Sequence, residues 1–142
     1  MQKMNKYSPE TIPMSKWNEK VLFDYLKENI VPDIEWQDYV FSRSDCHTKL
    51  SIIELKCRKI HYDNMMIEKQ KYNDLREIAR IRNKKAIYIN STPRGVYLWD
   101  ITNLDLKWYN QEIRHTTEFE DNTKVSKEVG YLSILDARKL KG

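Results

Sequence analysis

The acidic residues Asp45 and Glu54 and the basic residue Lys56 are of types that do chemistry, and they lie close together in the sequence. Glu54 and Lys56 are two positions apart in the apolar run 51–57. Successive side chains of a strand point to opposite faces, so on a strand these two side chains share one face. The carboxylate of Glu54 and the ammonium group of Lys56 can then contact the same bound group. The same spacing is also common in solvated surface strands, and the pair alone leaves that interpretation open.

A tight hairpin over residues 45–54, centred on Lys49-Leu50, would place Asp45 directly across from Glu54. The Cβ atoms of two residues paired in this way are about 5 Å apart. Lys49-Leu50 lacks the Gly, Asn or Asp that a two-residue turn favours. A looser loop is the alternative, and it would bring the same two carboxylates together.

Two carboxylates placed opposite each other suit one hard divalent cation. Oxygen-only ligation with water remaining in the coordination shell is typical of Mg²⁺ or Mn²⁺. A metal held by acids can supply a nucleophilic water, neutralise the charge that develops on a phosphodiester and assist the leaving oxygen. Lys56 would hydrogen-bond the attacking water or a phosphate oxygen, and its charge favours ionised carboxylates nearby. The pattern therefore indicates phosphodiester hydrolysis.

The first element expected to support this site is a helix over residues 15–30, with Ser15 as its N-cap and Pro32 beyond its end. Its apolar side chains form one broad arc at 100° per residue. Glu19 falls inside that arc, so its carboxylate is expected to point toward the protein rather than toward water.

A second helix is expected over residues 63–82, with both Glu68 and Lys71 inside its core-facing arc. A turn at residues 92–95 separates two short apolar runs. The strands are expected over 34–41, 51–57, 86–90, 96–101, 107–114 and 129–135. The order of helix, strands, helix and strands predicts an α/β or α+β fold, with helices packed on a sheet.

This ordered set of elements and residues resembles the PD-(D/E)XK nuclease superfamily, which includes restriction endonucleases, phage endonucleases and archaeal-type Holliday junction resolvases. The resemblance covers residues 15–101. It consists of a helix with an inward Glu19, a strand, the acid Asp45, an apolar strand ending in Glu54-Leu55-Lys56, a helix with inward polar residues and two more strands. The resemblance implies a restriction-endonuclease-like αβββαβ core, with a mixed central sheet flanked by helices.

By this resemblance, Asp45, Glu54 and the Leu55 carbonyl would bind the metal, Mg²⁺ or Mn²⁺. Glu19 would correspond to the first-helix acid that many members use for metal binding. Lys56 would be the catalytic lysine. The resemblance thus assigns a role to each residue that the spacing had singled out.

Two positions of the superfamily pattern leave a choice. Glu68, Gln70 and Lys71 are candidates for the polar position on the helix that follows the Glu-x-Lys strand, and we favour Lys71 because it lies at the centre of the apolar arc. A literal Pro-Asp pair ends at Asp33, which makes this residue the alternative metal acid. We favour Asp45 because a strand is expected between the two, and the superfamily's acid opens the second strand.

The charge of the chain is unevenly distributed. The formal net charge is +4, yet residues 1–55 sum to −2, residues 56–85 to +6 and residues 86–142 to 0. A local basic stripe favours a polyanion such as DNA, because each phosphate contact releases a counterion. A solvated helix face is the alternative. The candidates for DNA contact are Arg58, Lys59, Lys69 and Gln70.

The length of 142 residues and the 40% of hydrophobic residues predict a single domain. Residues 1–13 are expected to be a flexible arm, residues 15–101 the core, and residues 102–142 C-terminal strands and a tail. No apolar run approaches the roughly 18–20 residues that span a bilayer, and the N-terminus lacks the apolar stretch of a signal peptide. We therefore expect no membrane partner and a cytoplasmic location, which for a viral protein would be the host cytoplasm.

Cys46, His47, Cys57 and His61 raise the alternative of a structural zinc site. Cys57 and His61 are separated by three residues, but the set contains no compact Cys-x-x-Cys or His-x₃-His pair. We favour buried thiols as the interpretation of both cysteines.

Asp45, Glu54 and Lys56, with Glu19 in support, predict that the protein is a Mg²⁺-dependent DNA endonuclease. A short chain without a separate specificity domain favours structure-directed cleavage of junctions or branched DNA. Two symmetric cuts would require a homodimer. The alternative is a catalytically inactive nuclease-fold protein that binds nucleic acid, or a virus-encoded interaction protein. The retention of Glu19, Asp45, Glu54 and Lys56 argues against lost catalysis.

Overall fold

The computed structural model describes residues 8–37, 44–114 and 124–142. The helices and strands are α1 (Glu19–Asn29), β1 (Glu35–Trp36), β2 (Cys46–His47), β3 (Ser51–Cys57), β4 (Asn64–Glu68), α2 (Lys69–Ile81), β5 (Lys85–Thr92), β6 (Gly95–Asp100), β7 (Tyr109–Arg114), β8 (Lys124–Ser133) and β9 (Arg138–Lys141), with short 3₁₀ turns at Pro9–Thr11, Met14–Lys16 and Ile134–Asp136.

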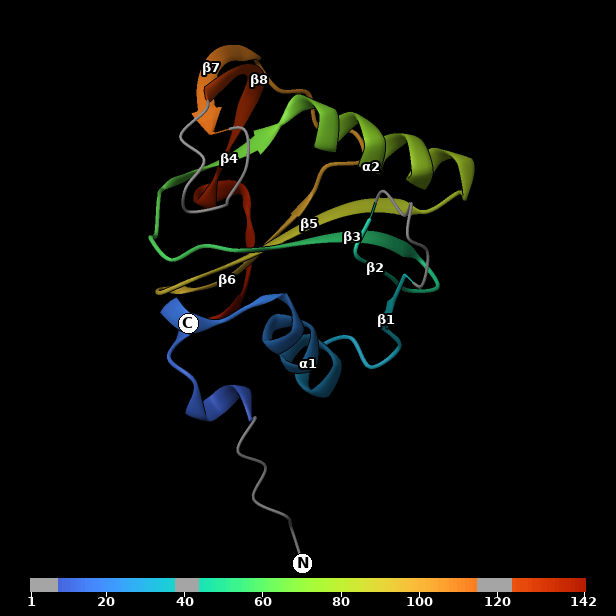
Figure 1. Cartoon of the computed structure of the whole chain (residues 1–142). Helices are drawn as coiled ribbons and strands as arrows, with labels where there is room; N and C mark the ends of the chain where they lie inside the picture. Colours follow the sequence, from blue (N-terminus) through green and yellow to red (C-terminus); the bar gives the residue numbers. More distant parts are fainter. Residues whose placement is uncertain (1–7, 38–43, 115–123) are drawn as a thin grey trace, which may run out of the picture.

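A six-stranded mixed sheet with the order β1-β2-β3-β5-β6-β9 runs through the molecule. Helix α1 covers one face of this sheet, while α2 and a three-stranded sheet of order β4-β8-β7 cover the other (Figure 1). Strands β3 and β5 are parallel, and the other paired strands are antiparallel. The segment of β4 and α2 makes the crossover that a parallel pair requires. The predicted mixed sheet flanked by helices is confirmed.

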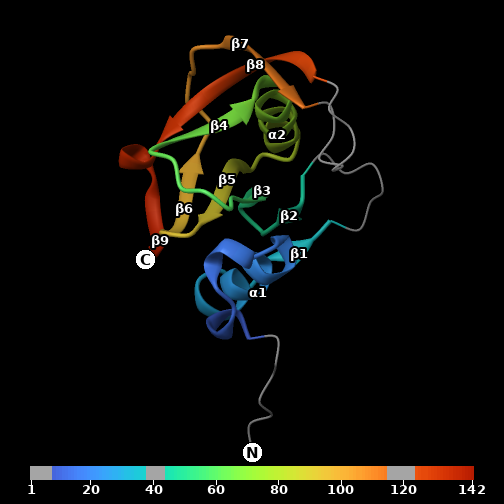
Figure 2. The same ribbon diagram turned by 60° about the vertical axis from the view of Figure 1, so that its left-hand side comes forward.

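The core consists of two apolar clusters, one on each face of the large sheet. Ile53 and Leu55 pack toward α1, whereas Ile52 packs toward α2. Turned by 60°, the molecule shows α1 and α2 separated by the large sheet (Figure 2). The alternation along β3 places Glu54 on the same face as Ile52, as the sequence pattern predicted. The packing of Ile52 shows that this face lies toward α2.

The hairpin of β2 and β3 has the predicted register. Cys46 pairs with Ile53 and His47 with Ile52, which are the pairs that the predicted hairpin requires. Asp45 directly precedes these paired residues and lies beside β3, since its N–H donates to the Ile53 carbonyl. In the turn, Thr48 N donates to the Ser51 carbonyl at 2.9 Å. The Thr48 hydroxyl accepts hydrogen bonds from Leu50 N at 3.2 Å and Ser51 N at 3.0 Å. This side-chain capping closes the turn without a glycine.

Two predictions about the helices are corrected. The N-cap of α1 is Asn18, whose side chain accepts from Val21 N, and Ser15 lies in the preceding 3₁₀ turn. The helix predicted over 63–82 begins only at Lys69. The residues before it form β4, because they alternate between buried and accessible and pair with β8. A segment of only five residues, of which three are apolar, satisfies the helical and the strand period equally well, and the distant partner strand decides between them.

The C-terminal third contains one strand more than predicted. The strand expected over 107–114 begins at Tyr109, and that over 129–135 extends from Lys124 to Ser133, with the next residues in a 3₁₀ turn. Most of the polar stretch 116–127 lies outside the described residues, whose last segment begins at Lys124. The predicted tail forms β9, which pairs with β6. Gly95, at φ +154°, allows this pairing, since a Cβ there would collide with the Lys141 carbonyl.

Near the N-terminus, the described part of the predicted arm is attached to the α1 core. Ile12 packs against that cluster, and its carbonyl accepts a hydrogen bond from Trp17 Nε1 at 2.9 Å. Residues 1–7 of the arm, and residues 38–43 of the strand predicted over 34–41, lie outside the described part. Among the described residues, no helix has the length and apolar character to cross a membrane.

Candidate active site

Glu54 is the most strongly perturbed carboxylate at the face between β3 and α2. Its side chain is 13% exposed, and its Oε2 lies 3.3 Å from Lys71 Nζ. Its other oxygen, Oε1, is buried and has no hydrogen-bond partner among the described residues. Burial raises the pKa of Glu54 to about 7, and the charge of Asp45 adds to the rise, while Lys71 opposes it. A buried carboxylate oxygen of this kind can serve as a ligand for a cation.

Asp45 is held against β3 by backbone contacts. Its Oδ2 accepts a hydrogen bond from Leu55 N at 2.9 Å, and its own N–H donates to the Ile53 carbonyl at 3.2 Å. These contacts fix the carboxylate beside the strand that carries Glu54. The negative charge of Asp45 raises the pKa of Glu54, because the two carboxylates repel each other. A divalent cation placed with both would relieve this repulsion.

Glu19 and Lys56 lie close enough for the charge of Lys56 to influence the pKa of Glu19. Partial desolvation and the charge of Asp45 raise the pKa of Glu19, and the charges of Lys56 and Lys71 lower it. Lys56 is exposed and, together with Glu19, lines a hollow of about 500 Å³. The Asn18 cap fixes the start of α1 beside this hollow. This cap differs from the predicted Ser15, although an Asn directly before Glu19 is itself a common N-cap residue.

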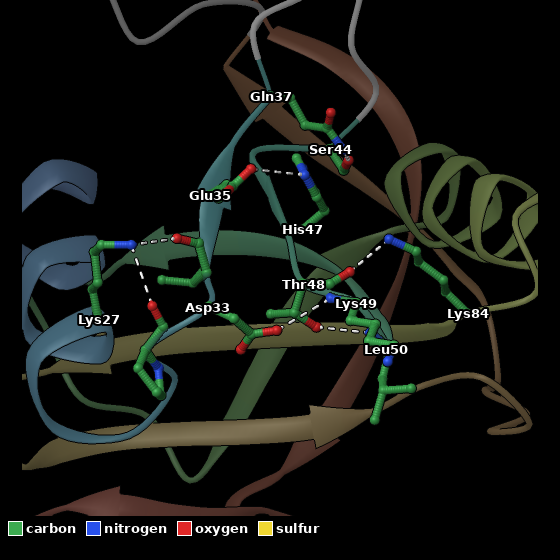
Figure 3. Close-up of polar contacts among 12 residues, drawn as sticks. Lys27, Asp33, Glu35, Gln37, Ser44, His47, Thr48, Lys49, Leu50 and Lys84 are labelled. Carbon is green, nitrogen blue, oxygen red and sulfur yellow. Dashed lines mark hydrogen bonds and ion pairs between the residues drawn. The ribbon is translucent and has the colours of Figure 1, made fainter.

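Asp33, the alternative acid, has a structural role at the hairpin turn. It is exposed, and its Oδ2 accepts a hydrogen bond from Lys49 N at 3.3 Å (Figure 3). Near it, Lys84 Nζ donates to the Thr48 carbonyl at 2.5 Å. These two hydrogen bonds, from Lys49 N and from Lys84 Nζ, hold the turn of the hairpin that carries Asp45 and Glu54. Asp45, and not Asp33, is the acid that accepts from β3 and perturbs Glu54.

The candidate DNA contacts lie in two places. Arg58 is bound internally: its Nε donates to Asn90 Oδ1 at 2.9 Å, and its Nη2 donates to the Met66 carbonyl at 2.5 Å. These bonds join the end of β3 to β5 and β4, and a contact of Arg58 with DNA stays a prediction. Lys59 is exposed in the loop after β3.

The other two candidates occupy the first turn of α2. Lys69 Nζ lies 3.2 Å from Glu128 Oε2 and 5.7 Å from the centre of the Trp108 ring. Gln70 Nε2 donates to Asp74 Oδ1 at 3.0 Å. Their positive and polar groups therefore have partners on the protein that a bound DNA would have to share or replace.

The two cysteines and His61 do not converge on one point. Burial raises the pKa of both the Cys46 and Cys57 thiols, which disfavours the thiolates that zinc requires. His61 Nδ1 is 2.9 Å from Thr92 Oγ1, and its Nε2 is 3.6 Å from Asp63 Oδ1. Within the three described segments, no group of three or more His, Cys, Asp or Glu side chains is close enough to hold a metal ion.

Comparison with known proteins identifies the fold. No protein-family model and no curated protein sequence matches the chain. Among solved structures, the chain is similar to Hjc of Archaeoglobus fulgidus, a Holliday junction resolvase from an archaeal hyperthermophile. The TM-score is 0.52 and the sequence identity 16%, over 84% of this chain and 88% of that chain. The chain therefore has a fold similar to that of this resolvase, a restriction-endonuclease-like mixed α/β fold.

Proposed function

We propose that the protein is a metal-dependent DNA endonuclease that hydrolyses phosphodiester bonds in a structure-directed way, at junctions or branches. The observation that carries this proposal is the buried Oε1 of Glu54, for which no partner lies among the described residues. It stands beside a second carboxylate, Asp45, which a hydrogen bond from Leu55 N holds against the same strand, in a fold similar to that of a Holliday junction resolvase. Asp45 and Glu54 are two carboxylates that repel each other, and they offer only oxygen atoms as ligands. Mg²⁺ and Mn²⁺ favour such ligands.

Within this proposal, Asp45, Glu54 and the Leu55 carbonyl hold the cation, and Glu19 supports it from the start of α1. The donor set fits, because Glu54 Oε1 lacks a partner within the described part of the chain and the hydrogen bond from Leu55 N already orients Asp45. The bound cation would supply charge neutralisation and water activation. Fewer than three side chains converge within the described segments, so water would complete the shell.

The lysines have separate roles in the proposed reaction. Lys56 is exposed on the face of β3 that carries Glu54, where it can hydrogen-bond the attacking water or a phosphate oxygen. Lys71 lowers the pKa of Glu54 and thereby favours the ionised form that binds a cation. Lys71 is thus a positioning residue for Glu54 as well as a candidate to touch the phosphate.

The substrate and assembly follow from the proposed chemistry. The solved structure with the similar fold is described as a Holliday junction resolvase, and the similarity spans 84% of this chain, which leaves few residues in it for reading a long sequence. Two symmetric cuts in a junction require two active sites, which a homodimer provides. DNA is therefore the proposed partner, and a homodimer the proposed assembly.

The experiment incubates purified protein with labelled linear duplex, single-stranded, flapped and four-way-junction DNA, in Mg²⁺, in Mn²⁺ and in EDTA. Metal-dependent cutting that is fastest on branched or junction DNA is the expected result. No cutting of any of these DNAs in either metal would overturn the proposal. Cutting of linear duplex at the same rate as the junction would leave a nuclease that is not structure-directed.

A catalytically inactive nuclease-fold protein that binds nucleic acid is the second candidate. The observation that favours it is the lack, among the described side chains, of a ready group of three metal ligands. The same samples distinguish the two candidates, because this protein would retard the DNA on a native gel without cutting it in Mg²⁺ or Mn²⁺.

A further inference from the structure

A hollow of about 780 Å³ lies between the first turn of α2 and the hairpin of β7 and β8. Lys69, Gln70, Lys71 and Asn73 line it on the side of α2, and Asn110 and Ser126 line it on the side of the hairpin. In both views α2 lies beside β8 (Figures 1 and 2). A volume of this size falls within the roughly 300–1,000 Å³ of ligand pockets.

The hollow adjoins the candidate active site through one residue. Lys71 lines the hollow, and its Nζ lies 3.3 Å from Glu54 Oε2. A DNA strand whose phosphate lies at Glu54 therefore has a neighbouring nucleotide within reach of the hollow. A part of that nucleotide is then the natural occupant.

The charge of the hollow does not favour a bare phosphate. Its three lysines face three acids, and two cross-hollow ion pairs connect them, since Lys127 Nζ lies 2.7 Å from Glu68 Oε1 and Lys69 Nζ lies 3.2 Å from Glu128 Oε2. An anion placed here would have to break pairs that already neutralise each other. A neutral ligand with hydrogen-bonding groups fits this balance of charges.

The neutral side chains of the hollow match the edge of a nucleobase. Gln70, Asn73 and Asn110 each carry an amide with donors and an acceptor, and Ser126 adds a hydroxyl. The bond from Gln70 Nε2 to Asp74 Oδ1 orients one of these amides. Amide side chains pair with base edges through a donor and an acceptor together.

We infer that this hollow binds an unpaired nucleobase of the DNA, next to the phosphate at Glu54. The inference rests on the proposed function, since it names the part of the DNA that the site recognises. A base can enter only if it is outside a base pair, as it is at a branch point or a bulge. The hollow would thus contribute to the preference for DNA structure over DNA sequence.

The test measures binding in EDTA by fluorescence anisotropy, so that no DNA is cut. One duplex carries a single unpaired nucleotide, and a second carries an abasic residue at the same place. The two duplexes have the same backbone charge, so a difference in affinity reports the base alone. The wild type is compared with Asn73→Ala/Asn110→Ala, with each single variant, and with Asn103→Ala, a matched control at an exposed asparagine after β6 that does not line this hollow.

The wild type and Asn103→Ala are expected to bind the duplex with the unpaired base at least about fivefold more tightly than the abasic one. The double variant is expected to bind both equally, and each single variant to show a weaker preference than the wild type. Thermal unfolding of every variant is expected to match the wild type, because Asn73 and Asn110 are exposed.

Equal affinity of the wild type for the two duplexes would overturn the inference and leave the proposed nuclease standing. A base preference that persists in the double variant would place base recognition outside this hollow and overturn it as well. Binding to none of the DNAs would overturn both the inference and the proposed function.

Discussion

Glu54 on β3 and Lys71 in the first turn of α2 form an ion pair, with 3.3 Å between Glu54 Oε2 and Lys71 Nζ. This pair joins the central sheet to the helix that covers it, and it leaves Glu54 Oε1 without a partner among the described residues. Burial and the charge of Asp45 raise the pKa of Glu54, the ion pair with Lys71 opposes them, and the net result is a pKa of about 7. The balance between these effects decides whether Glu54 is ionised near neutral pH.

The first prediction concerns the cost of burying the Glu54 carboxylate in the metal-free protein. The folded-state pKa of about 7 is above the ordinary value of 4.5, so the folded state binds the proton more tightly than the unfolded state. Stability from this group is present below pH 4.5 and disappears as the pH rises to about 7. Glu54→Gln removes the charge, and we expect it to stabilise the protein at pH 8 by on the order of 3 kcal/mol, and by much less at pH 5.

Thermal melting followed by circular dichroism at the two pH values checks this prediction, with Glu28→Gln as the control because Glu28 is exposed on α1. Equal melting temperatures of Glu54→Gln and wild type at pH 8 would show that Glu54 is not desolvated as described.

The second prediction concerns Lys71. Replacing Lys71 with Met removes the positive charge that lowers the Glu54 pKa, so the pKa is expected to rise further above 7. NMR titration of the Glu54 carboxyl in the metal-free protein measures the pKa directly. If the nuclease proposal holds, the rising limb of the pH–rate profile moves to higher pH in this variant. Lys16→Met, at an exposed lysine near the N-terminus, is the matched control, and an identical Glu54 titration in the two variants would contradict the ion pair.

The third prediction concerns metal binding. A cation that binds Asp45 and Glu54 in the folded state alone stabilises that state by about 2.7 kcal/mol at roughly one hundred times its dissociation constant. Mg²⁺ or Mn²⁺ is therefore expected to raise the melting temperature of the wild type and of Glu28→Gln. Asp45→Asn and Glu54→Gln are expected to show no such rise. A rise of equal size in all four proteins would place the cation elsewhere.

The fourth prediction separates structural from electrostatic roles among the basic residues. Arg58→Met removes bonds that join β3 to β5 and β4, and we expect it to lower the stability by about 1–3 kcal/mol. Lys59→Ala/Lys69→Ala is expected to reduce the slope of log affinity for DNA against log salt by about 0.9 for each phosphate that the variant no longer neutralises. Fluorescence anisotropy over a salt series measures this slope, with Lys16→Ala as the control.

If the salt dependence of DNA affinity is unchanged in Lys59→Ala/Lys69→Ala, these lysines do not contact phosphate and are ordinary solvated surface residues. A stable Arg58→Met variant with a reduced slope would favour a contact of Arg58 with phosphate over the internal role.

The hairpin was predictable from the sequence, whereas its surroundings were only partly so. The alternation of 51–57 predicts that Glu54 and Lys56 share a face, and the pairs Cys46–Ile53 and His47–Ile52 are those of the tight hairpin expected over 45–54. The run 64–68 was wrongly predicted as helix, because five residues do not distinguish the two periods and the partner strand β8 lies far along the chain. The choice of Lys71 as the inward polar residue agrees with its ion pair to Glu54.

The pairing of the basic residues could not be read from the sequence. The +6 charge of residues 56–85 was interpreted as a basic stripe that favours DNA, but Lys69 forms an ion pair with Glu128, which lies 59 residues further along the chain. Tertiary contacts of this kind change what a local count of charges means. Composition and spacing located the carboxylates, and only the fold shows which cations already have partners.

The most direct test of the central claim is the rate of junction cleavage under single-turnover conditions in Mg²⁺, for wild type, Glu54→Gln and Glu28→Gln. The wild type and Glu28→Gln are expected to cut at similar rates, and Glu54→Gln, although folded and at least as stable, is expected to be slower by about a thousandfold or more. Cleavage by Glu54→Gln at the rate of the wild type would contradict the assignment of the active site.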